Sequence, residues 1–412
     1  MLNSDSKSHT AYRLAVVATH PIQYQAPLWR AIAASGNIDL HVYYACRHGV
    51  EASLDRGFGK SFVWDIPLLQ GYEHTFLPSI HMPIFKKPVA DRWPRRLYRE
   101  LHGQGFDALL VHGYMTAAAW AGLTAAWRLR LPVIMRGDTH DHGRSQSVKQ
   151  IVKRWVLPLF LDKVDGFLAI GKWNQEYWGN CGVSKSRIVT SLYAVDNDFF
   201  STKSEEQKEQ ALALRAKWGA DSEATVFLYC AKLTPVKAPE ILLKAFAMLK
   251  DEKAHLVFVG SGLLESNLKK LQLQLGTEQV HWEGFVNQSS LPAYYRAADV
   301  LVLPSRREQW GLVVNEAMAC GTPCIVSDAV GAGPDLVDAA ATGVIFRHND
   351  VMHLADALRR ARDPRLRDSW QGNIPKTLEK ASLSKNVEAM LVLLEQVKRF
   401  NKHSRKVIAL QE

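Results

Sequence analysis

Short apolar runs alternate with segments of helical spacing throughout the first half of the chain. Residues 14–18 are apolar and are followed by a polar Thr-His-Pro segment, which is typical of a buried parallel strand that ends in a loop. Further runs of the same kind cover residues 38–44, 108–111, 132–135 and 166–170. This alternation predicts a doubly wound parallel sheet with helices between its strands.

The same alternation restarts after a charged interruption. Residues 201–222 are rich in charge and poor in large apolar side chains, which favours an interdomain connection. The strands expected after it cover residues 225–230, 255–259, 300–303, 323–327 and 343–346. We therefore predict an α/β protein with two Rossmann-like, doubly wound parallel-sheet domains. Because open parallel sheets bind ligands beyond the carboxyl ends of their strands, the two domains should face a shared cleft.

This pattern divides the chain into four expected segments. The N-terminal domain covers residues 1–200, the connection 201–222 and the C-terminal domain 223–380. Residues 381–412 contain a helical pattern and a basic tail, and this helix can pack back across the domain boundary.

The composition suits a packed enzyme in the cytoplasm. A chain of 412 residues exceeds one ordinary core, and 47% hydrophobic with 22% charged residues is usual for a globular protein. The sequence contains no apolar run of about 20 residues, and its first ten residues lack the apolar stretch of a secretory signal. Five cysteines without a paired framework suit a reducing compartment.

Most of the net charge of +10 lies in the N-terminal half, where two clusters mix basic and aromatic side chains. Such a cluster attracts polyanions or anionic lipid head groups, and it can equally be the solvated face of a helix. Charge alone is too weak a signal for nucleic acid, so we expect no such partner, whereas the inner membrane face is a candidate. The clusters comprise Lys86, Lys87, Arg92, Trp93, Arg95, Arg96, Tyr98 and Arg99, and then Lys149, Lys153, Arg154 and Trp155.

The segment after the expected strand 300–303 carries the clearest chemistry. Glu308 and Glu316 lie eight positions apart, with Gly311 and Leu312 between them at an expected helix start. Glycine lets the backbone approach a ligand, and the unpaired N–H groups of a helix start suit a phosphate. A carboxylate further along that helix can accept hydrogen bonds from the vicinal hydroxyls of a ribose.

This segment resembles the retaining glycosyltransferases of family 4, the group 1 glycosyltransferases of GT-B fold, whose hallmark is two glutamates separated by seven residues. The resemblance implies that Glu308 contacts the transferred sugar and that Glu316 binds the ribose. It also implies that the amides of Gly311 and Leu312 hold the diphosphate of a nucleotide-sugar donor. The C-terminal domain should then bind the donor and the N-terminal domain the acceptor.

Other parts of residues 225–345 extend the resemblance. Lys232 and Lys237 match the family's Gly-Arg-Leu and Lys-Gly pattern, with lysine in place of arginine at Lys232 and Ala238 in place of glycine. Two cations here would neutralise the charge that grows on the diphosphate as the sugar departs, so they would stabilise the transition state. Softer matches are the glycine turn at Gly260 and the segment with Phe285 and Val286, whose backbone lies against the nucleobase in the family.

The N-terminal domain departs from the family pattern. Its first loop contains His20 instead of a glycine-rich sequence, and Asp138 stands where many members have a histidine that touches the donor sugar. Asp138 is therefore our candidate for holding a sugar hydroxyl, with His140 as the alternative. Either residue can instead satisfy local backbone groups in its loop. His112 and His20 also follow strands and are further candidates for the cleft.

The resemblance implies transfer with retention of the anomeric configuration, no metal and no other cofactor. The acceptor would be a saccharide or a lipid-linked molecule, as in surface polysaccharide or lipopolysaccharide assembly. Two other classes remain open, a sugar-nucleotide epimerase of the same architecture, which needs no acceptor, and a non-catalytic protein that binds sugar nucleotides. A dehydrogenase is disfavoured because no Gly-x-Gly-x-x-Gly follows the first strand.

Overall fold

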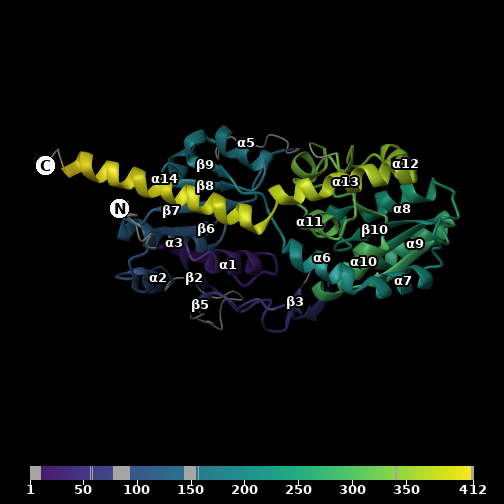
Figure 1. Cartoon of the computed structure of the whole chain (residues 1–412), viewed down its shortest axis with the longest axis horizontal. Coiled ribbons are helices and arrows are strands. Elements are labelled where there is room, and N and C mark those ends of the chain that lie inside the picture. The colour runs from purple at the N-terminus through teal and green to yellow at the C-terminus, as the bar shows by residue number, and fades with distance from the viewer. Residues whose placement is uncertain are drawn as a thin grey trace, which may run out of the picture.

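Two parallel sheets form the cores of two domains, which lie side by side along the long axis of the molecule (Figure 1). The first sheet has the order β5-β2-β1-β6-β7-β8-β9 and the second β12-β11-β10-β13-β14-β15. Neighbouring strands in both sheets run parallel. The predicted fold class is therefore confirmed. The structure, a computed structural model, describes residues 11–409 apart from 56, 58, 78–92, 143–154, 156 and 339–340.

Each expected strand coincides with an observed strand to within two residues at either end, because the central strands are covered on both faces and read as unbroken apolar runs. The strands of the N-terminal domain are β1 (Tyr12–Ala18), β2 (Ile38–Tyr44), β5 (Glu73–Phe76), β6 (Ala108–His112), β7 (Val133–Gly137), β8 (Gly166–Ala169) and β9 (Ile188–Thr190), with a separate hairpin of β3 (Ser53–Asp55) and β4 (Lys60–Phe62). Those of the C-terminal domain are β10 (Thr225–Cys230), β11 (Ala254–Val259), β12 (Val280–Gly284), β13 (Val300–Leu303), β14 (Cys324–Ser327) and β15 (Gly343–Phe346).

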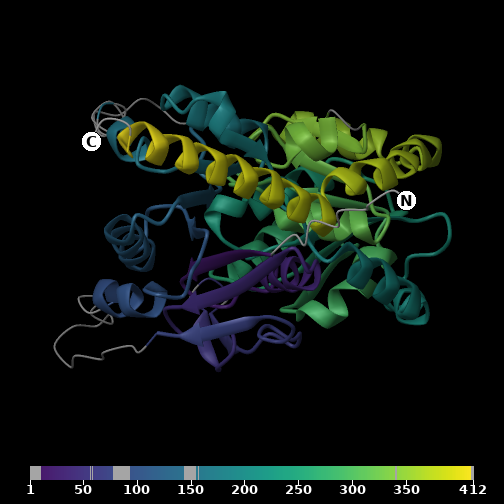
Figure 2. The ribbon, with the colours of Figure 1, turned by 60° about the vertical axis from the view of Figure 1, so that its left-hand side comes forward.

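Helices cover both faces of each sheet (Figures 1 and 2). In the N-terminal domain these are α1 (Gln25–Ala34), α2 (Trp93–Leu101), α3 (Ala117–Leu129) and α5 (Lys172–Asn180). The C-terminal half contains α6 (Asn197–Glu206), α7 (Lys208–Lys217), α8 (Pro239–Ala247), α9 (Glu265–Leu275), α10 (Leu291–Ala297), α11 (Leu312–Ala319), α12 (Val351–Arg360), α13 (Pro364–Lys380) and α14 (Leu383–Ala409).

The charged stretch 201–222 is folded onto the C-terminal domain instead of lying between the two domains. Most of it belongs to α6 and α7, which pack against α10, and α6 also packs against α11. Ala211, Trp218 and Ala220 of this stretch are buried in the core there. The charge that suggested a connection is the solvent face of two helices. The chain passes between the domains earlier, at residues 191–196.

The long helix α14 returns to the N-terminal domain after α13 has packed against α11 of the C-terminal domain (Figure 2). Its apolar face packs on α1, β8 and β9 and buries Met390, Leu393 and Val397. Near its start, the side-chain oxygen of Asn386 accepts a hydrogen bond from the buried guanidinium of Arg136 at 2.7 Å. The domain boundary is thus spanned twice, by residues 191–196 and by the step from α13 to α14.

Candidate active site

The loop after β13 brings Glu308 to an ion pair with Lys237, across 71 residues of sequence. A carboxylate oxygen of Glu308 accepts from the Lys237 ammonium group, and the Ser305 hydroxyl donates to the same oxygen at 3.4 Å. Both partners are largely shielded from solvent, with 23% of the Lys237 side chain and 16% of the Glu308 side chain exposed. The pair is therefore better shielded from salt and water than a surface ion pair.

The short turn that carries Lys237 is held by Arg306. The Arg306 backbone N–H donates to the carbonyl of Val236 at 2.8 Å, and its guanidinium donates to the carbonyl of Pro235 and pairs with Glu240. The next residue, Ala238, has a left-handed φ of +52°, which explains why the family pattern places glycine there. Arg306 was not among the sequence candidates, because its partners lie far away in the chain.

Gly311 ends the loop and begins α11. Its φ of +102° suits glycine, and a Cβ there would lie 3.0 Å from a methyl of Leu303 and 3.1 Å from one of Val330. The backbone therefore turns tightly against β13, and the first N–H groups of α11, beginning at Leu312, follow directly after it. This arrangement is the one that the resemblance predicts for holding a diphosphate.

Glu316 is buried on α11 with only 6% of its surface exposed. Its carboxylate accepts from the Tyr295 hydroxyl at 2.6 Å and from the Gln288 amide at 3.2 Å. Burial raises the pKa of Glu316 to about 6, and the two hydrogen bonds oppose that rise. The carboxylate is thus held in place by two neutral donors, and no cation contributes to the shift.

Two cavities meet at Glu316. The first, with a volume of about 130 Å³, lies between the domains, and its walls come from both. It is lined by Gln23, Trp64, Cys230, Ala231, Val259, Gly260, Phe285, Val286, Gln288, Leu291, Val313 and Glu316. The predicted donor residues Gly260, Phe285, Val286 and Glu316 therefore share one cavity, which we call the base cavity.

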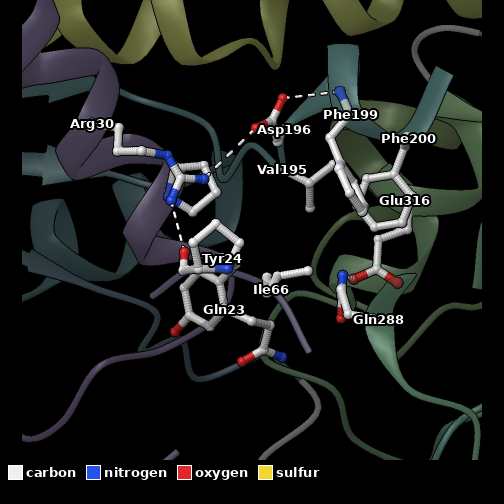
Figure 3. Close-up of a pocket in the computed structure, with 12 residues that line it drawn as sticks. Gln23, Tyr24, Arg30, Ile66, Val195, Asp196, Phe199, Phe200, Gln288 and Glu316 are labelled. Carbon is white, nitrogen blue, oxygen red and sulfur yellow. Dashed lines mark hydrogen bonds and ion pairs between the residues drawn. The ribbon is translucent and has the colours of Figure 1, made fainter. Parts of the chain in front are cut away.

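A neighbouring cavity of about 90 Å³ continues from Glu316 toward the N-terminal domain (Figure 3). Figure 3 shows Glu316 and Gln288 at one end and Arg30 at the other. The Arg30 guanidinium donates to the carbonyl of Pro67 at 2.8 Å and lies 3.9 Å from the carboxylate of Asp196. The two cavities share Gln23, Gln288 and Glu316 in their walls, so they adjoin between the two domains.

Gly260 has a backbone conformation on which the stability of the fold should depend. Its φ is +135°, and a Cβ would lie 2.0 Å from the carbonyl oxygen of Ala231. We expect Gly260→Ala to lower the free energy of unfolding by at least about 2 kcal/mol, because strain and a backbone clash add. Urea unfolding measures this change.

The matched control for that variant is Gly372→Ala. Gly372 lies within α13, and an added Cβ would meet nothing within 4 Å. Alanine should stabilise that helix by about 0.5–1 kcal/mol. Equal unfolding midpoints for the two variants would contradict the argument about Gly260.

The N-terminal domain contributes a third cavity at the carboxyl ends of its strands. Tyr24, Gln25, His112, Asp138 and Tyr193 lie in its walls. The Gln25 amide and the His112 ring lie 3.4 Å apart, and both Gln25 Oε1 and His112 Nε2 are buried without a protein partner. Burial, aided by the charge of Arg136, lowers the pKa of His112 to about 3, so its ring is neutral at physiological pH.

Asp138 faces the loop of Glu308. Burial raises the pKa of Asp138 above its ordinary value, and the charge of Glu308 across the domain boundary adds to the rise. His140 also reaches that loop, with its Nε2 3.4 Å from the Glu308 carbonyl oxygen and its ring 5.0 Å from that of Trp173. Asp138 thus opens onto the third cavity and His140 contacts the backbone beside it.

Two other predicted site residues, His20 and Lys232, contact residues other than Glu316. The His20 ring contacts His48 at 4.9 Å between centroids, and burial together with His48 lowers the pKa of His20 to about 4. Lys232 is partly exposed at the end of β10, where its carbonyl accepts from the Tyr229 hydroxyl at 2.8 Å. The structure thus pairs Lys237 with Glu308 across the cleft side of the C-terminal sheet.

Several residues of the site could not be foreseen from local sequence. Trp310 is buried at the domain boundary, where its indole donates to Asn315 at 2.8 Å and its ring lies 6.0 Å from Tyr193. Gln288 and Tyr295 orient Glu316 from elements some 20 to 30 residues away. For Trp310 alone the sequence held a signal, since a tryptophan within the hallmark segment is a large apolar side chain that usually packs against something.

Most of the basic residues in the two N-terminal clusters, including Lys86, Lys87, Arg92, Lys149, Lys153 and Arg154, lie outside the described residues. Among the others, Arg96 pairs with Glu100 at 2.6 Å on α2, and Tyr98 stacks on His102. Trp155 is 79% exposed.

Models of known protein families match nearly the whole length of this chain. The family model described as Glycosyl transferases group 1 matches residues 211–403, and the one described as Glycosyltransferase Family 4 matches residues 30–199. The chain belongs to the group 1 glycosyltransferases. The recognition from the two glutamates is thereby confirmed, and each family model falls on one of the two sheet domains.

Curated relatives of this group 1 glycosyltransferase match it over less than half its length. A D-inositol 3-phosphate glycosyltransferase of Thermomonospora curvata is 34% identical over 200 residues, which is 45% of this chain and 46% of the relative. A protein of the same name from Streptomyces coelicolor is 39% identical over 159 residues, covering 36% of this chain and 35% of the relative. The chain thus spans less than half of the length of these relatives.

Solved structures resemble the whole chain. A glycosyltransferase from Rickettsia africae has a TM-score of 0.70 at 15% identity and covers 94% of this chain and 98% of its own. Anabaena HepE in complex with UDP and glucose has a TM-score of 0.68 at 15% identity, with 93% and 99% covered. WaaG, a glycosyltransferase involved in lipopolysaccharide biosynthesis, has a TM-score of 0.61 at 14% identity, with 91% and 97% covered. These likenesses show the GT-B fold.

Proposed function

We propose that this protein transfers a sugar, with retention of anomeric configuration, from a nucleotide-sugar donor to a saccharide or lipid-linked acceptor. The observation that carries the proposal is the shielded Lys237–Glu308 pair, whose glutamate lies on the loop leading through Gly311 to the buried Glu316. This loop and its helix offer a helix start for the diphosphate oxygens and a carboxylate for the ribose, and the turn of Lys237 adds a cation for the diphosphate.

In the proposed reaction, the bond between the anomeric carbon and the diphosphate oxygen breaks. A bond from the acceptor oxygen to that carbon forms on the same face of the sugar. The acceptor proton passes to the departing diphosphate, whose charge Lys237 and the first amides of α11 stabilise. Glu308 would position the sugar from one wall, and Asp138 would hold a hydroxyl from the opposite wall. The chain's own groups supply this stabilisation, so we expect activity to persist in EDTA.

The third cavity supports an acceptor whose reacting end is neutral and rich in hydroxyls. Among the described residues that line it, Asp138 carries the only full charge, since His112 is neutral. Gln25 and His112 offer buried hydrogen-bonding atoms, which suit hydroxyls better than a phosphate. The relatives named for inositol 3-phosphate make inositol and its 3-phosphate useful members of an acceptor panel.

A lipid-linked acceptor would require a membrane-binding surface beside this cavity. Tyr114 and Met115 line the cavity mouth, and Met115 is 81% exposed. Nearby, the exposed Trp120 packs on Phe160 at 5.1 Å, and Trp155 and Leu159 are strongly exposed. Exposed tryptophans beside basic segments suit a membrane interface. Among the described residues, no helix combines the length and the apolar character that crossing a bilayer requires.

Calorimetry with a panel of nucleotide sugars tests the donor site, followed by product analysis with and without acceptors. Selective binding of one donor, with transfer of its sugar, would support the proposal. A changed sugar nucleotide released without acceptor would instead show an epimerase, and binding with no turnover under any condition would show a non-catalytic protein.

Vesicle flotation tests the membrane surface. We expect the protein to float with vesicles that contain phosphatidylglycerol, and the Trp120→Ala, Trp155→Ala double variant to lose most of that binding. Leu273→Ala is the control, because Leu273 is 81% exposed on α9 of the other domain. Equal flotation of the double variant and the wild type would contradict a role of Trp120 and Trp155 in membrane binding.

A further inference from the structure

Residues 60–65 of the N-terminal domain reach across the cleft and contact residues 285–289 of the C-terminal domain. The Phe62 ring lies 4.6 Å from that of Phe285 between centroids. The carbonyl of Val63 accepts from the Asn287 side-chain amide at 2.9 Å. We call residues 60–65, which comprise β4 and the loop after it, the strap.

The carboxylate of Asp65 completes this contact. It accepts from the Ser289 backbone N–H at 3.1 Å and from the Ser289 hydroxyl at 2.5 Å. Ser289 lies in the short 3-10 helix Gln288–Ser290, and Gln288 is the residue whose amide donates to Glu316. The strap therefore holds the turn whose Gln288 orients Glu316, the carboxylate proposed to bind the ribose.

Within the strap, Trp64 lies in the wall of the base cavity. Gln23 is the other lining residue from the N-terminal domain, and the C-terminal domain contributes the rest, including the turn at Gly260, Phe285 and Val286. Apart from Glu316, which lies at the ribose end, no charged side chain lines this cavity among the described residues. A mostly apolar cavity with an indole in its wall suits an aromatic heterocycle.

We propose that Trp64 forms the second wall of the nucleobase site, so that the base of the donor is held between the two domains. This inference rests on the proposed function, because Glu316 must bind the ribose for the base to enter this cavity. The base stacks on the Trp64 indole, the ribose hydroxyls reach Glu316 and the diphosphate runs toward Gly311 and Lys237. A nucleotide so placed contacts both domains and therefore stabilises their closed arrangement.

Stacking on an indole is largely independent of which base is bound, since every base presents a π face. Trp64 should thus add affinity without selecting the base, and it should contribute nothing to a ligand that has no base. These two features separate a stacking role from a general effect on the fold.

The test compares Trp64→Ala, Trp64→Phe and wild type by calorimetry with UDP, and with inorganic pyrophosphate as a competitor of UDP. Loss of stacking should weaken UDP binding about tenfold or more in Trp64→Ala, and phenylalanine should restore most of it. The affinity for pyrophosphate should change less than twofold. Urea unfolding of both variants checks that the fold is intact.

Equal UDP affinity in wild type and Trp64→Ala, with binding lost in Glu316→Ala, would overturn the role of Trp64 and leave the proposed function standing. Parallel losses of UDP and pyrophosphate affinity would also overturn it, because they would show a structural effect. Failure of the wild type to bind any nucleoside diphosphate among UDP, GDP and ADP would overturn the proposed function together with this inference.

Discussion

Replacing Lys237 with methionine is expected to lower kcat by about two to three orders of magnitude, with a much smaller change in donor affinity. Methionine keeps the length of the stem and removes the charge. Negative charge on the diphosphate grows as the sugar departs, so the ammonium group interacts more strongly with the transition state than with the bound donor. Initial rates at saturating donor, together with calorimetry of donor binding, separate the two effects.

The ion pair with Glu308 adds to the loss. Without the Lys237 ammonium, the Glu308 carboxylate loses this ion pair in a largely shielded position, although the Ser305 hydroxyl still donates to it. Lys237→Arg keeps the charge with another geometry and should recover part of the activity. Lys269→Met is the matched control, since Lys269 pairs with Glu265 on the exposed side of α9. A kcat within threefold of wild type in Lys237→Met would refute the assigned role.

Replacing Glu316 with glutamine is expected to weaken nucleotide binding by about 10- to 100-fold, because hydrogen bonds to a charged acceptor are each worth about 1.5–3 kcal/mol. Glutamine keeps the volume of the side chain and can still accept from Tyr295, but it offers the ribose hydroxyls a neutral amide. Calorimetry with the preferred donor measures the change. A loss confined to kcat, with unchanged affinity, would place Glu316 elsewhere in the mechanism.

The raised pKa of Glu316 predicts how binding depends on pH. Nucleotide affinity should fall as the pH drops through about 6, since the protonated carboxyl is a poorer acceptor. In Glu316→Gln this step should disappear. A wild-type affinity that stays level from pH 7.5 to 5 would contradict the assignment of the ribose to this carboxylate.

The stability of the unliganded protein should move in the opposite direction. The pKa of Glu316 is raised on folding from 4.5 to about 6, so the folded state binds this proton more tightly than the unfolded state. The stability that it contributes is fully present below pH 4.5 and is lost as the pH rises through 6. At pH 8, Glu316→Gln should therefore be more stable than wild type by up to about 2 kcal/mol, and at pH 4 this difference should vanish.

Local sequence determined the apolar central strands and the hallmark segment of this protein, whereas it gave no sign of the shorter or more polar strands β3, β4, β5, β9 and β12. Central parallel strands such as β10 and β11 are buried at every position, so their apolar runs are visible without any knowledge of partners. Glu308, Gly311 and Glu316 lie within one loop and one helix, where spacing along the chain translates directly into spacing in space. Local composition gave a wrong prediction at residues 201–222, because the charge of an exposed helix face resembles the charge of an interdomain connection.

Only the tertiary structure decided which distant residues meet at the cleft. Lys237 meets Glu308 because β10 and β13 are neighbours in the sheet, and α14 covers the first domain because its apolar stripe finds α1, β8 and β9 there. The strap meets residues 287–289 across 224 positions of sequence. Such contacts depend on strand order and on the orientation of one domain against the other. The periodicity of a single segment encodes neither strand order nor domain orientation. Each segment buries its apolar face, and this face is satisfied by any apolar partner.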